Sequence, residues 1–268
     1  MSTIYGLSDI HGYYKEMLDS LSLVDLKSDQ SNKLIFVGDY ISRGPDSCAV
    51  LYHIKQLEQT YPGQVVVLSG NHDQMFLDWF FSDLENHWLA ADIQLRTTKS
   101  FFEPSQWNII YDKLVDLQGA PFKMSQLIKD ELERKHGELI KWLLTKNKSF
   151  FYETDNQIYV HAGISEVDPE LWKHATEESE FTWKYPAETG PFYKDIIAGH
   201  ISSAEVAGDE SYLGRVYWDQ ENHFFIDGDT PRSKTIPILK YETKTKTYSS
   251  FEKTVDGKWI EYRITELN

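Results

Sequence analysis

The chain has 268 residues, of which 41% are hydrophobic, and this is enough to bury one large core in a single domain. The formal net charge of -15 argues against a broad nucleic-acid-binding or membrane-binding face, because such faces need clustered lysine and arginine. The single cysteine, Cys48, rules out an internal disulfide, and the opening residues show no export signal, so we expect a cytoplasmic protein that binds neither nucleic acid nor a membrane.

The first third of the chain alternates between strand and helix patterns. Short runs rich in β-branched residues at 3–8, 33–39 and 64–70 predict strands, and the helical spacing at 13–24 and 45–61 predicts the helices between them. The resulting βαβαβ order indicates a partly parallel sheet whose central strands are buried on both faces.

Residues from about 74 to about 148 predict a helical insertion or cap. Helical spacing covers 76–95, 105–117 and 125–146, and no convincing strand interrupts it. Its aromatic residues either line a substrate cleft, where they would stack an adenine ring, or form a local core, which is the more frequent use of such spacing. The residues concerned are Trp79, Phe80, Phe81 and Trp88.

Strands return after residue 148 and continue to the end of the chain. Those at 149–155, 157–163 and 195–200 are followed by a tail of alternating segments, which we predict to be antiparallel. The tail segments cover residues 214–220, 223–229, 235–252 and 258–267. Two sheets are implied, one partly parallel and one closed by antiparallel strands.

Polar residues with metal-binding side chains follow these predicted strands. In open α/β sheets the carboxyl ends of the strands form the ligand crevice, so residues that are distant in sequence converge there. The residues are Asp9, His11, Asp39, Asn71, His72, His161 and His200.

Oxygen and imidazole ligands without a thiolate suit Mn²⁺, Fe or Zn²⁺. Two such ions, ~3.5–4 Å apart, would hold a phosphoryl group and lower the pKa of a bridging water. A carboxylate with two oxygens would have to bridge them, and Asp39 is the candidate. Each of these residues is a weak signal singly, but their occurrence in one order after successive strands points to a single site.

The motifs SDIHG, GDYISRG, GNHD, VHAG and AGH resemble those of the calcineurin-like metallophosphoesterases. The resemblance is to the branch that contains Ser/Thr phosphoprotein phosphatases and symmetrical diadenosine tetraphosphatases, and it covers most of residues 1–75 and 157–230. It implies an α/β fold, a four-layer α/β/β/α sandwich of two mixed sheets. We therefore expect residues 1–268 to form one metallophosphoesterase domain with the insertion at about 74–148.

The resemblance also implies a role for each site residue. Asp9, His11 and Asp39 would hold one divalent ion, and Asp39, Asn71, His161 and His200 the other. His72 would act as the catalytic acid that protonates the leaving oxygen. Arg43 would clamp the phosphate through its planar fork, with Asn71 as a further phosphate contact.

Two residues depart from the family pattern. In protein phosphatases the loop usually reads GDYVDRG, and its second aspartate orients the histidine that follows GN; here that position is Ser42, which predicts a weaker acid at His72. Alternatively Ser42 only caps a turn, and Asp73 or Asp46 supplies the charge. The family's second phosphate-binding arginine has no counterpart in residues 135–214, where Lys184 either replaces it as a point charge or lies on a solvated loop.

We therefore expect a phosphoesterase with two divalent ions, Mn²⁺ in the first place, that hydrolyses phosphomonoesters by attack of a bridging hydroxide and without a covalent phosphoenzyme. A phosphoprotein or phosphopeptide is the first-choice substrate, because Tyr40 matches protein phosphatases. A nucleotide polyphosphate is the alternative, because the tetraphosphatase branch also lacks the loop acid. A metal-binding scaffold without catalysis is a third hypothesis. Asp227 is expected to support a loop, and nothing in the sequence predicts the oligomeric state.

Overall fold

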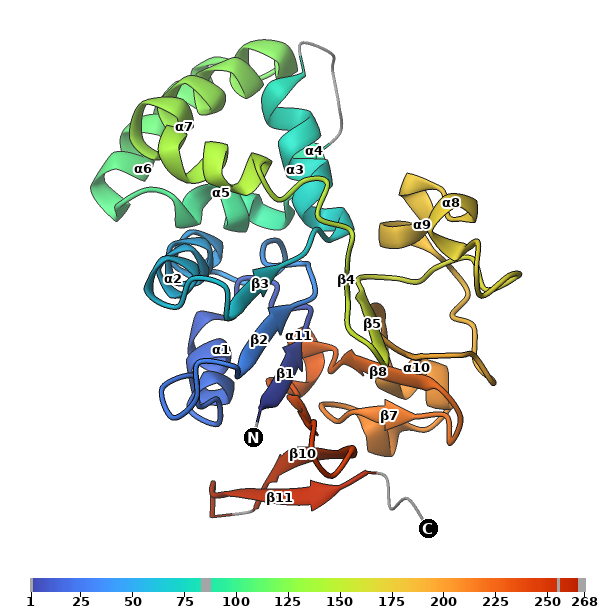
Figure 1. The fold of residues 1–268 in the computed structure, drawn as a ribbon. Coiled ribbons are helices and arrows are strands. Elements are labelled where there is room, and N and C mark those ends of the chain that lie inside the picture. Colours follow the sequence, from blue (N-terminus) through green and yellow to red (C-terminus); the bar gives the residue numbers. More distant parts are fainter. Residues whose placement is uncertain (1, 83–87, 255, 265–268) are drawn as a thin grey trace.

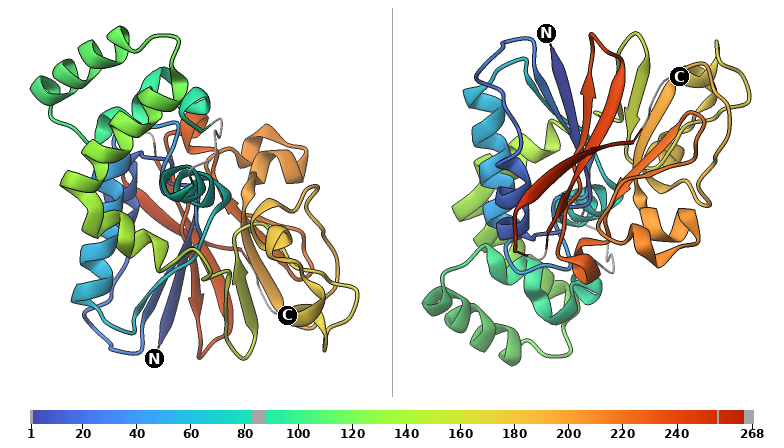
Figure 2. Two further views of the ribbon diagram at one scale, coloured as in Figure 1. Left: turned by 90° about the horizontal axis from the view of Figure 1, so that it is seen from above. Right: turned by 90° about the horizontal axis from the view of Figure 1, so that it is seen from below.

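The computed structural model describes residues 2–82, 88–254 and 256–264. In these ranges two mixed β-sheets pack face to face, and helices cover the outer face of each (Figures 1 and 2). The predicted α/β fold, a sandwich of two mixed sheets, is confirmed.

The first sheet has the strand order β11-β10-β9-β1-β2-β3. Strands β1 to β3 are parallel, and β9 to β11 are antiparallel additions beside β1. The strands are β1 (Thr3–Leu7), β2 (Lys33–Phe36), β3 (Val65–Val67), β9 (Leu239–Glu242), β10 (Thr247–Lys253) and β11 (Trp259–Arg263). Helices α1 (Tyr14–Leu21) and α2 (Ser47–Thr60) cover its outer face, as the sequence predicts.

The second sheet has the order β4-β5-β6-β8-β7, in which β5, β6 and β8 are parallel. The strands are β4 (Phe151–Glu153), β5 (Gln157–Val160), β6 (Asp195–Ser202), β7 (Tyr217–Trp218) and β8 (His223–Asp227). Short helices cover the outer face of this sheet: α8 (Trp172–Ala175), α9 (Glu178–Trp183), α10 (Ser203–Ala207) and η2 (Glu210–Tyr212). Trp172 and Phe181 pack there against Ile158. Helix α11 (Thr230–Ser233) follows β8 and contacts the loop after β1 instead.

The prediction of a uniformly antiparallel tail is wrong at β8. This strand pairs in parallel with β6, with Phe224 beside Ile197, and all five of its residues are buried. It is therefore a central strand. The segments after residue 235 do not close the second sheet either, because β9 pairs with β1 and extends the first sheet. Residues 265–267 of the last predicted strand lie outside the described residues.

The helical insertion is present where the sequence predicts it. Its elements are α3 (Asn71–Phe81), α4 (Trp88–Ala91), η1 (Ile93–Leu95), α5 (Arg96–Ser100), α6 (Pro104–Asp116) and α7 (Pro121–Leu144). Residues 83–87 of the predicted helix 76–95 lie outside the described residues. Trp79 and Trp88 are buried and stack with their ring centroids 5.0 Å apart. These rings form a local core, so they do not line a cleft.

The core between the two sheets aligns the strand ends that carry the polar residues. Val37 and Leu68, which follow β2 and β3, pack against Ile197 of β6 and Ile226 of β8. The carboxyl ends of β1, β2 and β3 therefore lie beside those of β5, β6 and β8. None of the helices in the described residues is long and apolar enough to cross a membrane.

Candidate metal centre

The backbone at the strand ends adopts conformations that non-glycine residues rarely take. Asp9, His11, Asp39 and His200 have φ angles of 53°, 49°, 58° and 66°. Such left-handed residues cost energy and are concentrated at sites where the surrounding structure over-determines them. Four of the six predicted ligands are thus held in strained turns that aim their side chains toward one region.

Two glycines allow the ligand loops to approach each other. A Cβ atom on Gly70 would lie 2.2 Å from Asp39 Oδ1, and one on Gly199 would lie 2.3 Å from Asp9 Oδ2. Any larger residue at either position would displace a carboxylate of the site. The GNHD and AGH motifs therefore need their glycines for close packing.

The predicted ligands form two groups that share Asp39. His11 Nε2 lies 3.7 Å from Asp9 Oδ1 and 3.7 Å from Asp39 Oδ2. On the other side of Asp39, His161 Nε2 lies 3.5 Å from Asp39 Oδ1 and 3.0 Å from Asn71 Oδ1. The rings of His161 and His200 lie 5.2 Å apart between their centroids. All six predicted ligands are therefore brought together, with Asp39 between the two groups.

Backbone carbonyls set the orientation of two imidazoles. His11 Nδ1 donates to the carbonyl of Ile41 at 3.0 Å, and His161 Nδ1 donates to the carbonyl of Val37 at 2.8 Å. Because a carbonyl can only accept, each ring keeps its proton on Nδ1 and presents the lone pair of Nε2 to the site. Metal-binding histidines typically have such a partner behind them.

Burial and mutual charge shift the pKa values of these groups, and for His11, His200 and Asp39 the direction suits metal binding. Burial lowers the pKa of His11 to about 3 and that of His200 to about 4, so both rings are neutral. Burial would raise the pKa of Asp39, but the neighbouring His161, His72 and His11 hold it at about 2. Burial and the charges of Asp227 and Asp39 raise the pKa of Asp9 well above its usual range.

Two divalent ions fit this set of residues. Donor atoms with bonds of about 2.0–2.2 Å to one ion lie roughly 3–4 Å from one another, which matches the observed 3.0 to 3.7 Å separations. The buried carboxylates of Asp9 and Asp39 also repel each other, and a cation between them removes that cost. Oxygen and imidazole donors favour Mn²⁺, Fe or Zn²⁺.

His72 and Arg43 border the centre. His72 Nε2 lies 4.0 Å from Asp39 Oδ2, and its ring meets the edge of the His11 ring at 5.0 Å. Burial lowers its pKa, and Arg43 adds to that shift. His72 lies so close to His11 and Asp39 that the three could touch one ion, which sequence reasoning missed. Arg43 is exposed, yet its charge acts on His11, His72 and His200, so the guanidinium faces the whole centre.

The carboxylate closest to His72 is Asp39 rather than Asp73 or Asp46. Asp73 is buried and accepts hydrogen bonds from the backbone amides of Asp39, Tyr40 and Gly70 at 2.8, 3.1 and 3.2 Å. It therefore fixes the loop. Asp46 is exposed at the start of α2. Among the hydrogen bonds of the described residues, none joins the Ser42 hydroxyl to His72.

Lys184 lies in the loop that follows α9. Its ammonium group is bound to the carbonyl of Ile164 and to Glu188 Oε2, the latter at 2.6 Å. The preceding Trp183 has its ring 6.4 Å from that of His200. The loop thus borders the centre, while the lysine charge is already paired within it.

Asp227 supports a loop and also lies within electrostatic range of Asp9. Its carboxylate accepts the backbone amide of Asp229 at 2.7 Å, which is the predicted loop-supporting contact. Burial raises its pKa to about 7, and its charge in turn raises the pKa of Asp9. Its position at the carboxyl end of β8 follows the same strand-end rule as the six predicted ligands.

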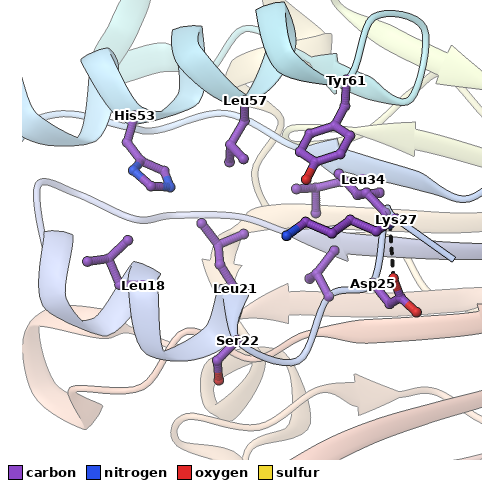
Figure 3. Close-up of a pocket in the computed structure, with 11 residues that line it drawn as sticks. Leu18, Leu21, Ser22, Asp25, Lys27, Leu34, His53, Leu57 and Tyr61 are labelled. Carbon is purple, nitrogen blue, oxygen red and sulfur yellow. Dashed lines mark hydrogen bonds between the residues drawn. The ribbon is translucent and has the colours of Figure 1, made fainter.

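A pocket of about 430 Å³ lies between α1 and α2, away from these strand ends (Figure 3). Leu18, Leu21 and Leu57 face one another in it, and Lys27 extends across it. None of the predicted ligands lines it. The chemistry of the chain is therefore assigned to the strand ends.

Residues 2–228 match the family model for calcineurin-like phosphoesterases. The chain belongs to that family. Membership confirms the resemblance drawn from the five motifs.

Similar proteins carry two kinds of name. A symmetrical bis(5'-nucleosyl)-tetraphosphatase of Nitrosospira multiformis is 39% identical over 161 residues, which cover 60% of this chain and 43% of that protein. The one of Salmonella paratyphi C is 26% identical over 76% of this chain and 59% of its own length. A cold-active protein tyrosine phosphatase superposes with a TM-score of 0.58 at 18% identity, covering 98% and 79% of the two chains, which shows a shared fold. This chain spans about half the length of the curated relatives.

Proposed function

We propose that this chain hydrolyses phosphoanhydride bonds of nucleoside polyphosphates at a centre of two divalent ions, held by Asp9, His11, Asp39, Asn71, His161 and His200. When bound, the ions supply Lewis-acid stabilisation of the phosphoryl group and lower the pKa of a water. Mn²⁺ is the first choice. Arg43 holds non-bridging oxygens through its fork, and the amide nitrogen of Asn71 contacts the phosphate while its Oδ1 faces His161.

We base the choice of substrate on the surroundings of His72. Its nearest carboxylate is Asp39, which the ions neutralise, and Ser42 replaces the aspartate that charges this histidine in protein phosphatases. When phosphoserine is hydrolysed, the serine oxygen leaves as an alkoxide and needs a proton. General-acid catalysis that supplies this proton contributes about 10²- to 10⁴-fold in rate. When a phosphoanhydride of a nucleotide is hydrolysed, the leaving group is a phosphate. Because the last pKa of such a phosphate is about 6, it needs no proton. A His72 ring that carries a proton only part of the time suits the second substrate.

Tyr40 does not favour a protein substrate. Its side chain is fully buried, and its hydroxyl donates to the carbonyl of Leu68 at 2.5 Å. The hydroxyl also accepts the backbone amide of Gly38 at 3.2 Å. Tyr40 therefore supports the loop of Asp39 from inside the core. Because its side chain is fully buried, it contacts no substrate. The names of the tetraphosphatase relatives point in the same direction as His72.

Lys184 would be a secondary phosphate contact. A phosphate must first displace Glu188 and the carbonyl of Ile164 from its ammonium group. We therefore assign the larger part of phosphate binding to Arg43.

The test compares turnover with Mn²⁺ on p-nitrophenyl phosphate, a phosphoserine peptide and diadenosine tetraphosphate, with Asp39→Asn as the blank. We expect kcat/KM for the dinucleotide to exceed that for the peptide by about 100-fold, the lower end of general-acid effects. Preference for the peptide would overturn the proposal in favour of a protein-phosphatase-like enzyme. A protein that contains no metal and is not activated by Mn²⁺ would be the non-catalytic scaffold.

A further inference from the structure

One aromatic ring is exposed directly beside the metal centre. All eight tryptophans lie in the described ranges, and of these only Trp183, at 48%, is exposed. Its ring lies 6.4 Å from the ring of His200 at an interplanar angle of 72°. Of the four rings that the sequence offers for base stacking, Trp79, Phe80 and Trp88 are buried in the insertion, and Phe81 is exposed at the opposite end of α3 from Asn71. Trp183 is therefore the exposed tryptophan that a substrate bound at the centre would contact.

Trp183 is held in place by its neighbours in the chain. The carbonyl of Phe181 accepts the amide of Ala162, the residue after His161, at 2.8 Å. Thr182 Oγ1 is buried and donates to Gln74 Oε1 on α3 at 2.8 Å, three residues after Asn71. Lys184 is bound to Ile164 and Glu188. The backbone on both sides of Trp183 is thus anchored to the segments that carry His161 and Asn71.

A second exposed ring extends this surface. Tyr185 is 71% exposed, and its hydroxyl lies 3.3 Å from Glu205 Oε1 on α10, the helix that follows the strand of His200. Tyr185 thus lies two residues after Trp183 and contacts the helix that follows the strand of His200. Exposed aromatic rings that are held rigidly lose little entropy when a planar ligand stacks on them.

We propose that Trp183 forms a base-stacking subsite, on which the nucleobase of a nucleoside polyphosphate lies while its phosphates occupy the metal centre. This inference rests on the proposed function. A ribose and intervening phosphates separate the base from the reacting phosphate, so the base falls beside the centre, where Trp183 borders His200. Every nucleobase has a π-face, and the subsite therefore selects for a base rather than for adenine alone.

The kinetic test uses Trp183→Ala, with Trp183→Phe to keep a ring and Phe122→Ala as a control for loss of an exposed ring elsewhere. Substrates are diadenosine tetraphosphate and inorganic tripolyphosphate, which has no base. We expect Trp183→Ala to lower kcat/KM for the dinucleotide by roughly 5- to 150-fold more than for tripolyphosphate. Trp183→Phe and Phe122→Ala should change that ratio less than threefold. An equal loss on both substrates would overturn the subsite.

A second test does not depend on dinucleotide turnover. ADP and pyrophosphate are compared as inhibitors of p-nitrophenyl phosphate hydrolysis, and as quenchers of tryptophan fluorescence. ADP should inhibit the wild-type protein more strongly than pyrophosphate and quench its fluorescence, and both differences should disappear in Trp183→Ala. If ADP behaves this way but the dinucleotide is not hydrolysed, only the proposed function fails. If the dinucleotide is hydrolysed but ADP shows no preference over pyrophosphate, only the subsite fails.

Discussion

Asp9 Oδ2 accepts a hydrogen bond from the backbone amide of His200 at 3.0 Å, and this contact joins the two sheets at the candidate metal centre. Asp9 follows β1 of the first sheet, whereas His200 lies in β6 of the second. The other oxygen, Oδ1, faces His11. One carboxylate therefore serves as a predicted ligand and sets the distance between the ligands of the two sheets.

Asp9→Asn tests whether the centre stores charge repulsion that metal relieves. The amide oxygen can still accept from His200, but one carboxyl group of the buried acidic cluster is removed. We expect the melting temperature of the metal-free protein to rise by about 2–4 °C, or about 1 kcal/mol, while the increase on adding Mn²⁺ shrinks. Asp112→Asn, on the exposed face of α6, should change neither value. An undiminished Mn²⁺ response in Asp9→Asn would count against its role as a ligand.

Ser42→Asp tests the missing loop acid. A carboxylate at this position should hold the proton on His72 and raise turnover about 10-fold on alkyl phosphates, with less effect on aryl phosphates, whose leaving groups need less help. Ser42→Asn is the matched control, since it has the same shape without the charge. Equal gains on alkyl and aryl esters, or the same gain in Ser42→Asn, would show that protonation by His72 is not the limiting feature.

The strand ends were predictable because the βαβ pattern and the order of the motifs both depend on local sequence. The pairing of the strands could not be predicted, because a run of apolar residues indicates a central strand but does not show which strand lies next to it. This is why β8 was predicted as antiparallel and why β9 was placed in the wrong sheet. Side-chain partners at longer range were equally hidden. The contact of Lys184 with the carbonyl of Ile164, and the proximity of Asp227 to Asp9, depend on how loops pack rather than on any motif.

Asp73→Asn tests the support of the metal-binding loop. The carboxylate accepts three backbone amides, and an asparagine would turn its NH₂ group toward at least one of these donors. Leaving a buried donor unsatisfied costs about 1–3 kcal/mol, and bonds to a charged group are at the upper end. We expect the free energy of unfolding in urea to fall by about 3 kcal/mol. Asp78→Asn, exposed on the same helix, serves as the control and should lie within 0.5 kcal/mol, the usual range for surface substitutions.

His223, at the start of β8, is a buried histidine between two carboxylates. Its Nε2 lies 3.1 Å from Glu166 Oε1, and its Nδ1 lies 3.2 Å from Asp219 Oδ2 and 3.0 Å from the carbonyl of Gly190. Burial would lower its pKa, but Glu166 and Asp219 outweigh burial and raise it. The charge of His223 also lowers the pKa of Glu188, the residue that pairs with Lys184. The protonated ring thus joins three loops on the second sheet.

His223→Gln should therefore destabilise the protein most at low pH. Because the pKa in the folded state lies above the unfolded value of about 6.5, the stabilisation is fully present below pH 6.5 and is lost as the pH rises through the folded-state pKa. We expect the difference in unfolding free energy between wild type and variant to be about 1.5–3 kcal/mol at pH 6 and to shrink toward pH 9. Urea titrations at a series of pH values measure it. His174→Gln, at an exposed position of α8, should show no such trend. A difference that grows with pH would mean that His223 is neutral in the folded protein and that the carboxylates act on it only as hydrogen-bond acceptors.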